Sequence, residues 1–119
     1  MPRNLEPDPK PSESRALHRL ELRILMALLD GPNYGSRIVR EIEARCEGES
    51  KLYPANLFRR IRDLLARGLI EECDGPEGVD PRRTYMRVTP EGRAAAQAAA
   101  EQLRELVREA VGRKLLPES

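Results

Sequence analysis

Arginine side chains that could bind phosphate or a nucleic-acid base are concentrated in two short stretches of the chain. In the first, KLYPANLFRR, Asn56 stands about one helical turn before Arg59 and Arg60. An arginine guanidinium can bind guanine or phosphate through paired hydrogen bonds, and an asparagine amide can both donate to and accept from an adenine edge. Lys51, the first residue of this stretch, precedes the predicted helix and is better placed for the nucleic-acid backbone. The stretch predicts a helix whose first turns contact DNA.

The second stretch, DPRRTYMRVTPEGR, begins as a turn, alternates like a strand and ends as the start of a helix. Arg82 and Arg83 lie at the turn, where they could reach phosphates or a narrow minor groove beside the DNA-contacting helix. A solubilising turn in which Asp80 pairs with an arginine is the alternative, as a solvated helix face is for the first stretch. The predicted DNA contacts are Lys51, Tyr53, Asn56, Arg59, Arg60, Arg82 and Arg83.

The distribution of charge favours the same stretches. The formal net charge of the 119 residues is only +1, but residues 51–67 carry five basic side chains and one acidic one. Residues 68–79 carry four acidic side chains and no basic one. A nearly neutral protein with one concentrated basic segment can still present a basic face to a polyanion. Arg59, Arg60 and Arg62 are expected on the side of their helix away from the core, and the acidic segment in a solvated loop.

Residues suited to catalysis or metal binding do not form a recognisable set. The chain has one histidine, His18, and two cysteines, Cys46 and Cys73, with no metal-ligand spacing and no nucleophile beside a plausible base. We therefore expect no catalytic residues, no metal and no cofactor. His18 is expected at the surface or an interface. Both cysteines are expected to be buried apolar residues, with an oxidation switch as the minor alternative.

The chain has the length of one domain. No apolar run reaches the ~18 residues of a transmembrane helix, and the first residues lack the apolar core of a signal peptide. We expect a soluble, cytoplasmic protein without a membrane partner. Residues 1–13 hold four prolines and few apolar side chains, which is typical of a flexible tail.

The spacing of apolar residues predicts a mainly helical fold with a small two-stranded β-hairpin. In the second strand, Tyr85 and Arg87 lie on one face and Met86 on the other. The order of elements is typical of a winged helix-turn-helix domain, at residues 14–89, followed by a long C-terminal helix, at residues 90–116. The predicted elements are helices at 14–30, 35–46 and 54–67, strands at 69–73 and 84–89, and a helix from 90 to 112 or 116.

The predicted C-terminal helix is rich in alanine and carries a narrow apolar stripe at heptad-like spacing. Small residues let helices approach closely, and larger ones supply area to bury. In a monomer this stripe would remain largely in water, so we expect a homodimer. A protein two-fold axis implies a two-fold operator with half-sites about 10 bp apart. The stripe consists of Ala99, Leu103, Leu106, Val107 and Ala110.

Three blocks resemble PadR-family transcriptional regulators in order and spacing: ILMALLDGPNYGSRIVREIE, LYPANLFRRIRDLLARGLIEE and DPRRTYMRVTPEGRAA, over roughly residues 20–96. The resemblance implies a homodimeric winged-helix repressor that binds a palindromic operator. It implies dimerisation through a single C-terminal helix, as in the shorter subgroup, with help from the first helix, where Leu20 is our candidate. The chain departs from the family at Tyr53, Asn56 and Phe58, which replace a serine, a hydroxyl residue and a tyrosine.

The resemblance also implies a small aromatic effector, because many family members release DNA when such a molecule binds near the dimer interface. That site would need an apolar cavity with a few polar groups. Packing or DNA contact is the alternative role of its candidate side chains. The candidate residues that would line the effector cavity are Met26, Tyr34, Tyr53, Phe58 and Tyr85.

Since fold alone does not settle function, a winged-helix protein-interaction module without DNA binding is the alternative to a DNA-binding repressor.

Overall fold

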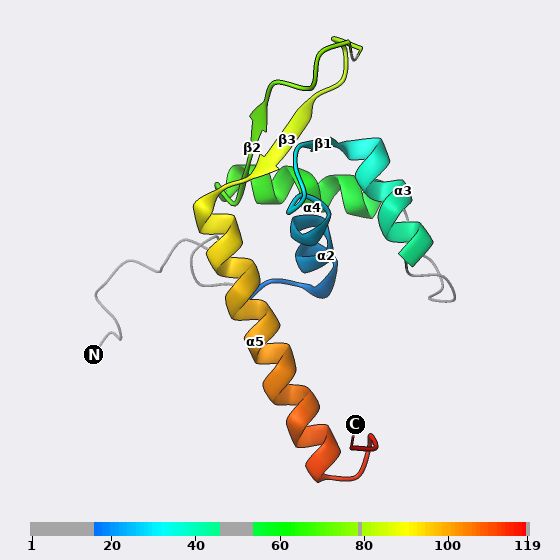
Figure 1. Cartoon of the computed structure of the whole chain (residues 1–119), viewed down its shortest axis with the longest axis vertical. Coiled ribbons are helices and arrows are strands. Elements are labelled where there is room, and N and C mark those ends of the chain that lie inside the picture. The colour runs from blue at the N-terminus through cyan, green and yellow to red at the C-terminus, as the bar shows by residue number, and fades with distance from the viewer. Residues whose placement is uncertain (1–15, 46–53, 79, 119) are drawn as a thin grey trace, which may run out of the picture.

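The computed structural model describes residues 16–45, 54–78 and 80–118. Within these residues the chain forms four helices and three short strands (Figure 1). The expectations for residues 1–13, Cys46, Lys51 and Tyr53 lie outside the described residues. The elements are α2 (Arg19–Ala27), β1 (Asn33–Tyr34), α3 (Gly35–Arg45), α4 (Pro54–Ala66), β2 (Ile70–Cys73), β3 (Tyr85–Val88) and α5 (Pro90–Gly112).

Helix α2 begins at a reciprocal cap. His18 is extended, with φ −70° and ψ 151°, and its Nδ1 accepts a hydrogen bond from the Leu20 backbone N–H at 3.0 Å. The Glu21 carboxylate accepts from the His18 backbone N–H at 2.9 Å, which completes a capping box. The helix is shorter than predicted at both ends. The apolar spacing continues past its end at Leu28 into a turn, which Gly31 closes with φ 145°.

Helices α3 and α4 form the helix-turn-helix unit. Gly35, the first residue of α3, lies so close to α4 that a Cβ at this position would stand 2.7 Å from the Phe58 ring. Glycine therefore permits this close approach. Helix α4 has Pro54 at its first position, as predicted. It closes where Gly68 takes φ 76° and donates its N–H to the Leu65 carbonyl.

The sheet has three antiparallel strands in the order β1-β3-β2, one more than the predicted hairpin. The additional strand forms because Asn33 and Tyr34 pair with Met86 and Tyr85 of β3. Tyr85 and Met86 are both buried although adjacent strand residues point to opposite faces. Tyr34 explains this, because its ring packs against that of Tyr85, whereas Arg87, farther along the same face, is exposed.

Helix α5 begins with Thr89 at its N-cap. The Thr89 hydroxyl accepts from the Gly92 backbone N–H at 3.0 Å and donates to the Gly68 carbonyl at 2.8 Å. Pro90 takes the first helical position, as predicted. The first turns of α5 pack against the core, and the rest projects away from the body of the molecule to end at Gly112 (Figure 1).

The hydrophobic core lies between α2, α3, α4 and the sheet, with the start of α5 against it. This is a winged helix-turn-helix fold with an added C-terminal helix, which confirms the predicted fold class. No helix in the described part of the chain has the length and apolarity needed to cross a membrane. The most completely buried apolar residues are Ile24, Leu25, Leu28, Ile38, Ile42, Leu57, Leu64 and Ile70.

Candidate nucleic-acid interface

Helix α4 divides its side chains between the core and the solvent. Leu57, Ile61 and Leu64 recur at helical spacing and are buried. Arg59 and Arg62 are exposed on the side away from the core, as expected. Arg62 was not among the predicted DNA contacts, although its spacing of three residues from Arg59 places both on neighbouring positions of the helix surface. The described part of α4 therefore offers two arginines to a partner.

Two of the predicted DNA contacts are joined to each other. The Arg59 Nη2 donates a hydrogen bond to the Asn56 Oδ1 at 2.7 Å. Asn56 is half-buried and Arg59 is exposed. A hydrogen bond from a charged donor is shorter and stronger than one between neutral groups. The two side chains therefore form one polar unit on the first turns of α4.

Arg60 does not share the solvent-facing side of α4, contrary to expectation. Its Nη1 lies 3.5 Å from the Oε2 of Glu21, a side chain that is only 1% exposed. Arg67, at the end of α4, places its own Nη1 3.4 Å from the other oxygen of the same carboxylate. The buried Glu21 on α2 thus supplies a countercharge that turns Arg60 inward. Nothing close to Arg60 in the sequence indicates this partner.

At the tip of the wing, defined here as the connection between β2 and β3, Arg82 is paired with Asp80. Its Nε and Nη2 donate to the two carboxylate oxygens at 3.1 and 3.0 Å, and its backbone N–H donates at 2.9 Å. These bonds, above all those from the Arg82 side chain, hold the pKa of Asp80 below its ordinary value. The carboxylate is therefore ionised at neutral pH. The pairing that was the alternative to DNA contact is present, yet the Arg82 side chain is 89% exposed.

The neighbouring arginine of the wing is held against β1. The Arg83 Cζ lies 4.4 Å from the centroid of the Tyr34 ring. A cation–π contact of this kind is worth about 0.5–1 kcal/mol at an exposed site. The Tyr34 ring in turn packs edge-on against Tyr85, with centroids 5.3 Å apart. The wing is thereby tied to the residue directly before α3, a contact that no local sequence pattern indicates.

Of the acidic segment, Glu71 and Glu72 lie on β2, the strand at the edge of the sheet opposite β1, and Asp74 and Glu77 lie in the connection that follows. Glu71 pairs with Arg87 directly across the two strands, with 2.7 Å between oxygen and nitrogen. Cys73 is half-buried rather than buried. Burial raises the pKa of its thiol. The thiolate is the reactive form, so this environment disfavours the oxidation switch at Cys73.

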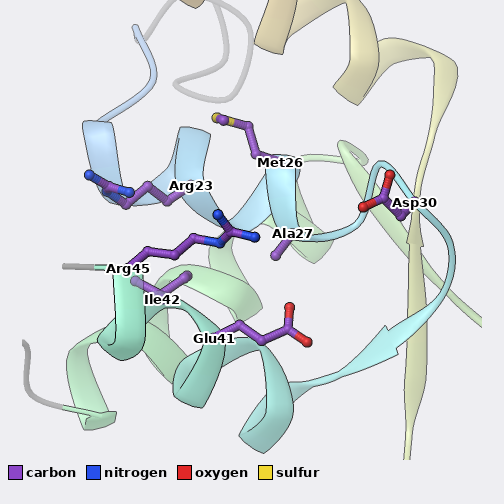
Figure 2. Close-up of a pocket in the computed structure, with 7 residues that line it drawn as sticks. All are labelled: Arg23, Met26, Ala27, Asp30, Glu41, Ile42 and Arg45. Atoms are coloured by element: carbon purple, nitrogen blue, oxygen red, sulfur yellow. The ribbon is translucent and has the colours of Figure 1, made fainter. Parts of the chain in front are cut away.

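Among the described residues, a cleft between α2 and α3 has a volume of about 190 Å³. Met26 lines it, as the effector hypothesis requires, but no aromatic side chain does. Figure 2 shows the Arg45 side chain extending from α3 toward α2. The cleft is lined by Arg23, Met26, Ala27, Asp30, Glu41, Ile42 and Arg45.

The described residues contain no group of three or more His, Cys, Asp or Glu side chains that could hold a metal ion.

A larger groove, of about 350 Å³, lies between α3, α4 and the wing. Two of the predicted effector-site residues, Tyr34 and Phe58, form part of its wall, and Arg83 borders it. Tyr85 is buried and does not line the groove. The groove therefore combines aromatic walls with a single guanidinium, next to the exposed side of α4.

Residues 101–109 of α5 are not buried by any other part of the described chain. Every residue from 101 to 109 is exposed, including Leu106 at 61% and Val107 at 49%. A hollow of about 210 Å³ separates this part of α5 from the start of α2. Of the predicted dimerisation residues, Leu103, Leu106 and Val107 are exposed, and Leu20, Ala99 and Ala110 are half-buried.

Comparisons with known proteins bear on this arrangement. The model of the transcriptional regulator PadR-like family matches residues 24–98. A transcriptional regulator from Clostridium thermocellum is similar in structure, with 28% identity, 79% of this chain and 87% of that chain covered, and a TM-score of 0.65. A search of curated proteins gave no match.

Two further solved structures are similar in fold. A PadR family transcription regulator from Clostridium difficile is 18% identical, with 83% of this chain and 100% of that chain covered and a TM-score of 0.66. A PadR-like transcriptional regulator from Bacillus cereus is 20% identical, with 83% and 93% covered and a TM-score of 0.66.

Proposed function

Because the chain belongs to the PadR-like family of transcriptional regulators, we propose that it is a homodimeric repressor of transcription. It binds a palindromic operator in the cytoplasm, with α4 in the major groove and the wing on adjacent phosphates. Members of this family are transcriptional regulators and not enzymes. The observation that carries the proposal is the exposed side of α4, where Arg59 and Arg62 stand opposite the buried apolar stripe and the half-buried Asn56 bonds to Arg59.

Different arginines serve different parts of this interface. Arg59 is exposed on the first turns of α4, which come closest to base edges when a recognition helix enters the major groove. Arg82 and Arg83, at the wing, contact phosphates and position the protein on the duplex. Arg60 acts through Glu21 instead, by holding α4 against α2. Lys51 and Tyr53 remain proposed contacts on the segment that leads into α4.

Arg59→Ala should lower affinity for the operator about tenfold or more, since a good arginine–base pair contributes about 1–3 kcal/mol of discrimination. Arg83→Ala should weaken binding to all sequences alike and reduce the slope of log K against log salt by about one unit. Fluorescence anisotropy titrations at several salt concentrations measure both effects. Arg108→Ala, an exposed arginine on α5, is the control and should change neither. Unchanged operator binding by Arg59→Ala would refute its assignment.

The proposed dimer rests on the exposure of α5. Helix α5 presents Leu103, Leu106 and Val107 to water. Exposed apolar side chains that lie together are expected to be buried against a second apolar surface. The hollow beside them is bordered on the other side by Leu17 and Leu22 of the segment that begins α2. A partner helix lying along this hollow would cover both sides at once. The two copies would then place two α4 helices on one duplex.

Leu106→Asp should convert the dimer to a folded monomer, because it sets a carboxylate in the proposed interface while its site in the single chain is exposed. Operator affinity should fall by roughly a hundredfold or more, since a monomer engages a single half-site. Sedimentation measures the first effect and anisotropy the second. Ala98→Asp adds the same charge at an exposed position of the same helix and should leave the dimer intact. A dimer that survives Leu106→Asp would place the interface elsewhere.

The groove between α3, α4 and the wing, which is away from the proposed dimer interface on α5, is the proposed site of a small aromatic effector. Its volume of about 350 Å³ is that of a small ligand site, and Tyr34 and Phe58 offer aromatic walls. A ligand there would displace Arg83 from Tyr34 and so loosen the wing. A thermal-shift screen with phenolic acids and cationic drugs should give a hit that Phe58→Ala abolishes. If no compound shifts the melting temperature, the effector role is wrong.

A further inference from the structure

Arg40 on α3 and Arg83 on the wing carry positive charges that the described part of the chain leaves without an acidic partner. Neither guanidinium forms an ion pair with a described Asp or Glu, and both side chains are exposed. Arg37, on the same helix as Arg40, has such a partner, because its Nε lies 3.1 Å from the Glu41 Oε2. Arg40 and Arg83 therefore differ from the arginines whose charge is offset within the chain.

These two guanidiniums meet at one side chain, that of Tyr34. The Arg83 Cζ lies 4.4 Å from the centroid of the Tyr34 ring, and the Arg40 Nη2 donates to the Tyr34 hydroxyl oxygen at 3.5 Å. Tyr34 itself is 8% exposed and packs edge-on against Tyr85, so its ring is held by the sheet. A fixed ring therefore brings together one arginine from α3 and one from the wing, which are far apart in the sequence.

Two like charges gathered at one side chain repel each other. The cation–π contact and the long hydrogen bond to a neutral hydroxyl each stabilise their arginine only modestly. An anion bound by both guanidiniums would supply the missing countercharge. The planar N–H fork of arginine matches the oxygens of a phosphate group, so the arginine pair has the chemistry of a phosphate site.

The position of the arginine pair in the fold favours a phosphate of the DNA backbone. Tyr34 and Arg83 line the groove between α3, α4 and the wing, beside the exposed side of α4. Figure 1 shows β1, which carries Tyr34, between β3 and the start of α3. When the second helix of a helix-turn-helix unit enters the major groove, the first helix crosses the DNA backbone. With α4 in the groove, Arg40 on α3 would therefore lie beside that backbone.

We propose that Tyr34 assembles Arg40 and Arg83 into one site for a backbone phosphate of the operator. This inference rests on the proposed function and adds Arg40 to the DNA contacts, a residue that the sequence did not single out. Tyr34 is a positioning residue, since its ring holds Arg83 and its hydroxyl holds Arg40. The site fixes how the wing and α3 together lie on the duplex, and it reads no base.

Arg40→Ala should lower affinity for every duplex alike, by about tenfold, and reduce the slope of log K against log salt by up to about one unit. The palindrome selected from a random library should stay that of the wild type. Arg37→Ala is the matched control, because it removes the same charge from the same helix where Glu41 already offsets it. It should change affinity by less than about twofold. Circular dichroism checks that both variants fold.

Tyr34→Phe tests the positioning role. It removes the hydroxyl that holds Arg40 and keeps the ring that contacts Arg83 and Tyr85. Affinity should fall about threefold in the wild-type background and stay unchanged in the Arg40→Ala background. An equal fall in both backgrounds would overturn the role of the hydroxyl, because a loss of stability alone acts in both.

Methylphosphonate substitution of the operator, one backbone position at a time, locates the phosphate. One position in each half-site should weaken binding of the wild type and have no further effect on Arg40→Ala and on Arg83→Ala. If the two variants respond at different positions, the arginines do not share a phosphate and the inference is wrong.

Inorganic phosphate distinguishes a free anion from the DNA backbone. If it raises the melting temperature of the wild type but not of Arg40→Ala, while both bind the operator equally, the site takes a free anion and the backbone assignment is overturned. Equal operator binding by Arg40→Ala and Arg37→Ala would contradict the inference and leave the DNA-binding function intact. Failure of the folded wild type to enrich any duplex would overturn both.

Discussion

Gly92→Ala should lower the free energy of unfolding by about 3 kcal/mol, at the upper end of what overpacking costs. A Cβ at Gly92 would lie 1.9 Å from the carbonyl oxygen of Leu69 and 2.9 Å from a Val88 methyl group. The first of these atoms belongs to the backbone, so no side-chain rotation relieves the clash. The Leu69 carbonyl also accepts the hydrogen bond from the Thr89 N–H, at 3.1 Å, at the start of α5. The substitution should therefore separate α5 from the hairpin.

Gly112→Ala is the matched control, because it makes the same change in the same helix, at a position where a Cβ would meet no atom of the described residues within 4 Å. It should be neutral or stabilise the protein by roughly 0.4–1 kcal/mol, as alanine restricts the unfolded chain more than glycine does. Urea denaturation followed by circular dichroism measures both variants. If Gly92→Ala is as stable as Gly112→Ala, the start of α5 does not pack against the hairpin as described.

Glu21→Ala should be similarly destabilising, by about 3 kcal/mol, because it removes the buried carboxylate that faces both Arg60 and Arg67. Arg67 then keeps Asp63, which lies 3.5 Å away and is the more exposed of its two acidic partners. The Glu21 side chain is 1% exposed, and the Arg67 guanidinium beside it is 6% exposed. The Arg60 Nε is also buried, with no hydrogen-bond partner among the described residues, so the Arg60 guanidinium depends on the same carboxylate for its countercharge. The variant additionally loses the hydrogen bond from the His18 N–H that caps α2.

Glu105→Ala is the control for this prediction. It removes a carboxylate from an ion pair within α5, formed with Arg108 at 2.7 Å, in which both side chains are about two-thirds exposed. Exposed pairs contribute little, so this variant should stay within about 0.5 kcal/mol of the wild type. Denaturant midpoints of the two variants give the comparison. Equal stability of Glu21→Ala and Glu105→Ala would show that the buried cluster does not hold α4 against α2.

Local patterns explain how much of the fold could be predicted. The apolar spacing of α3 and α4, Pro54 at the first position of α4 and Thr89 before Pro90 are all signals within a few residues. The start of α2 was misplaced because its cap is a histidine, His18, which is not among the common N-cap residues. Strand β1 was missed because two residues become a strand only through pairing with distant β3.

The site shows the same limit. The sequence places Arg59 and Arg82 correctly at a helix surface and a turn, since both positions follow from local spacing. It does not show that Arg60 turns inward, because its partner Glu21 lies on another helix, 3.5 Å away in space and distant in the chain. Nor does it show that Arg83 rests on Tyr34. Partners that are distant in sequence decide which arginines remain available to DNA.

The most direct test of the central claim is selection of bound duplexes from a random library, followed by anisotropy titration of the selected duplex at several salt concentrations. A dimeric DNA-binding repressor should select a palindrome, bind it as two chains per duplex, and lose affinity with salt at a slope of about −0.9 per phosphate contact. No enrichment by a folded dimer, together with a stoichiometric protein partner in a pull-down, would contradict this account and favour the protein-interaction module.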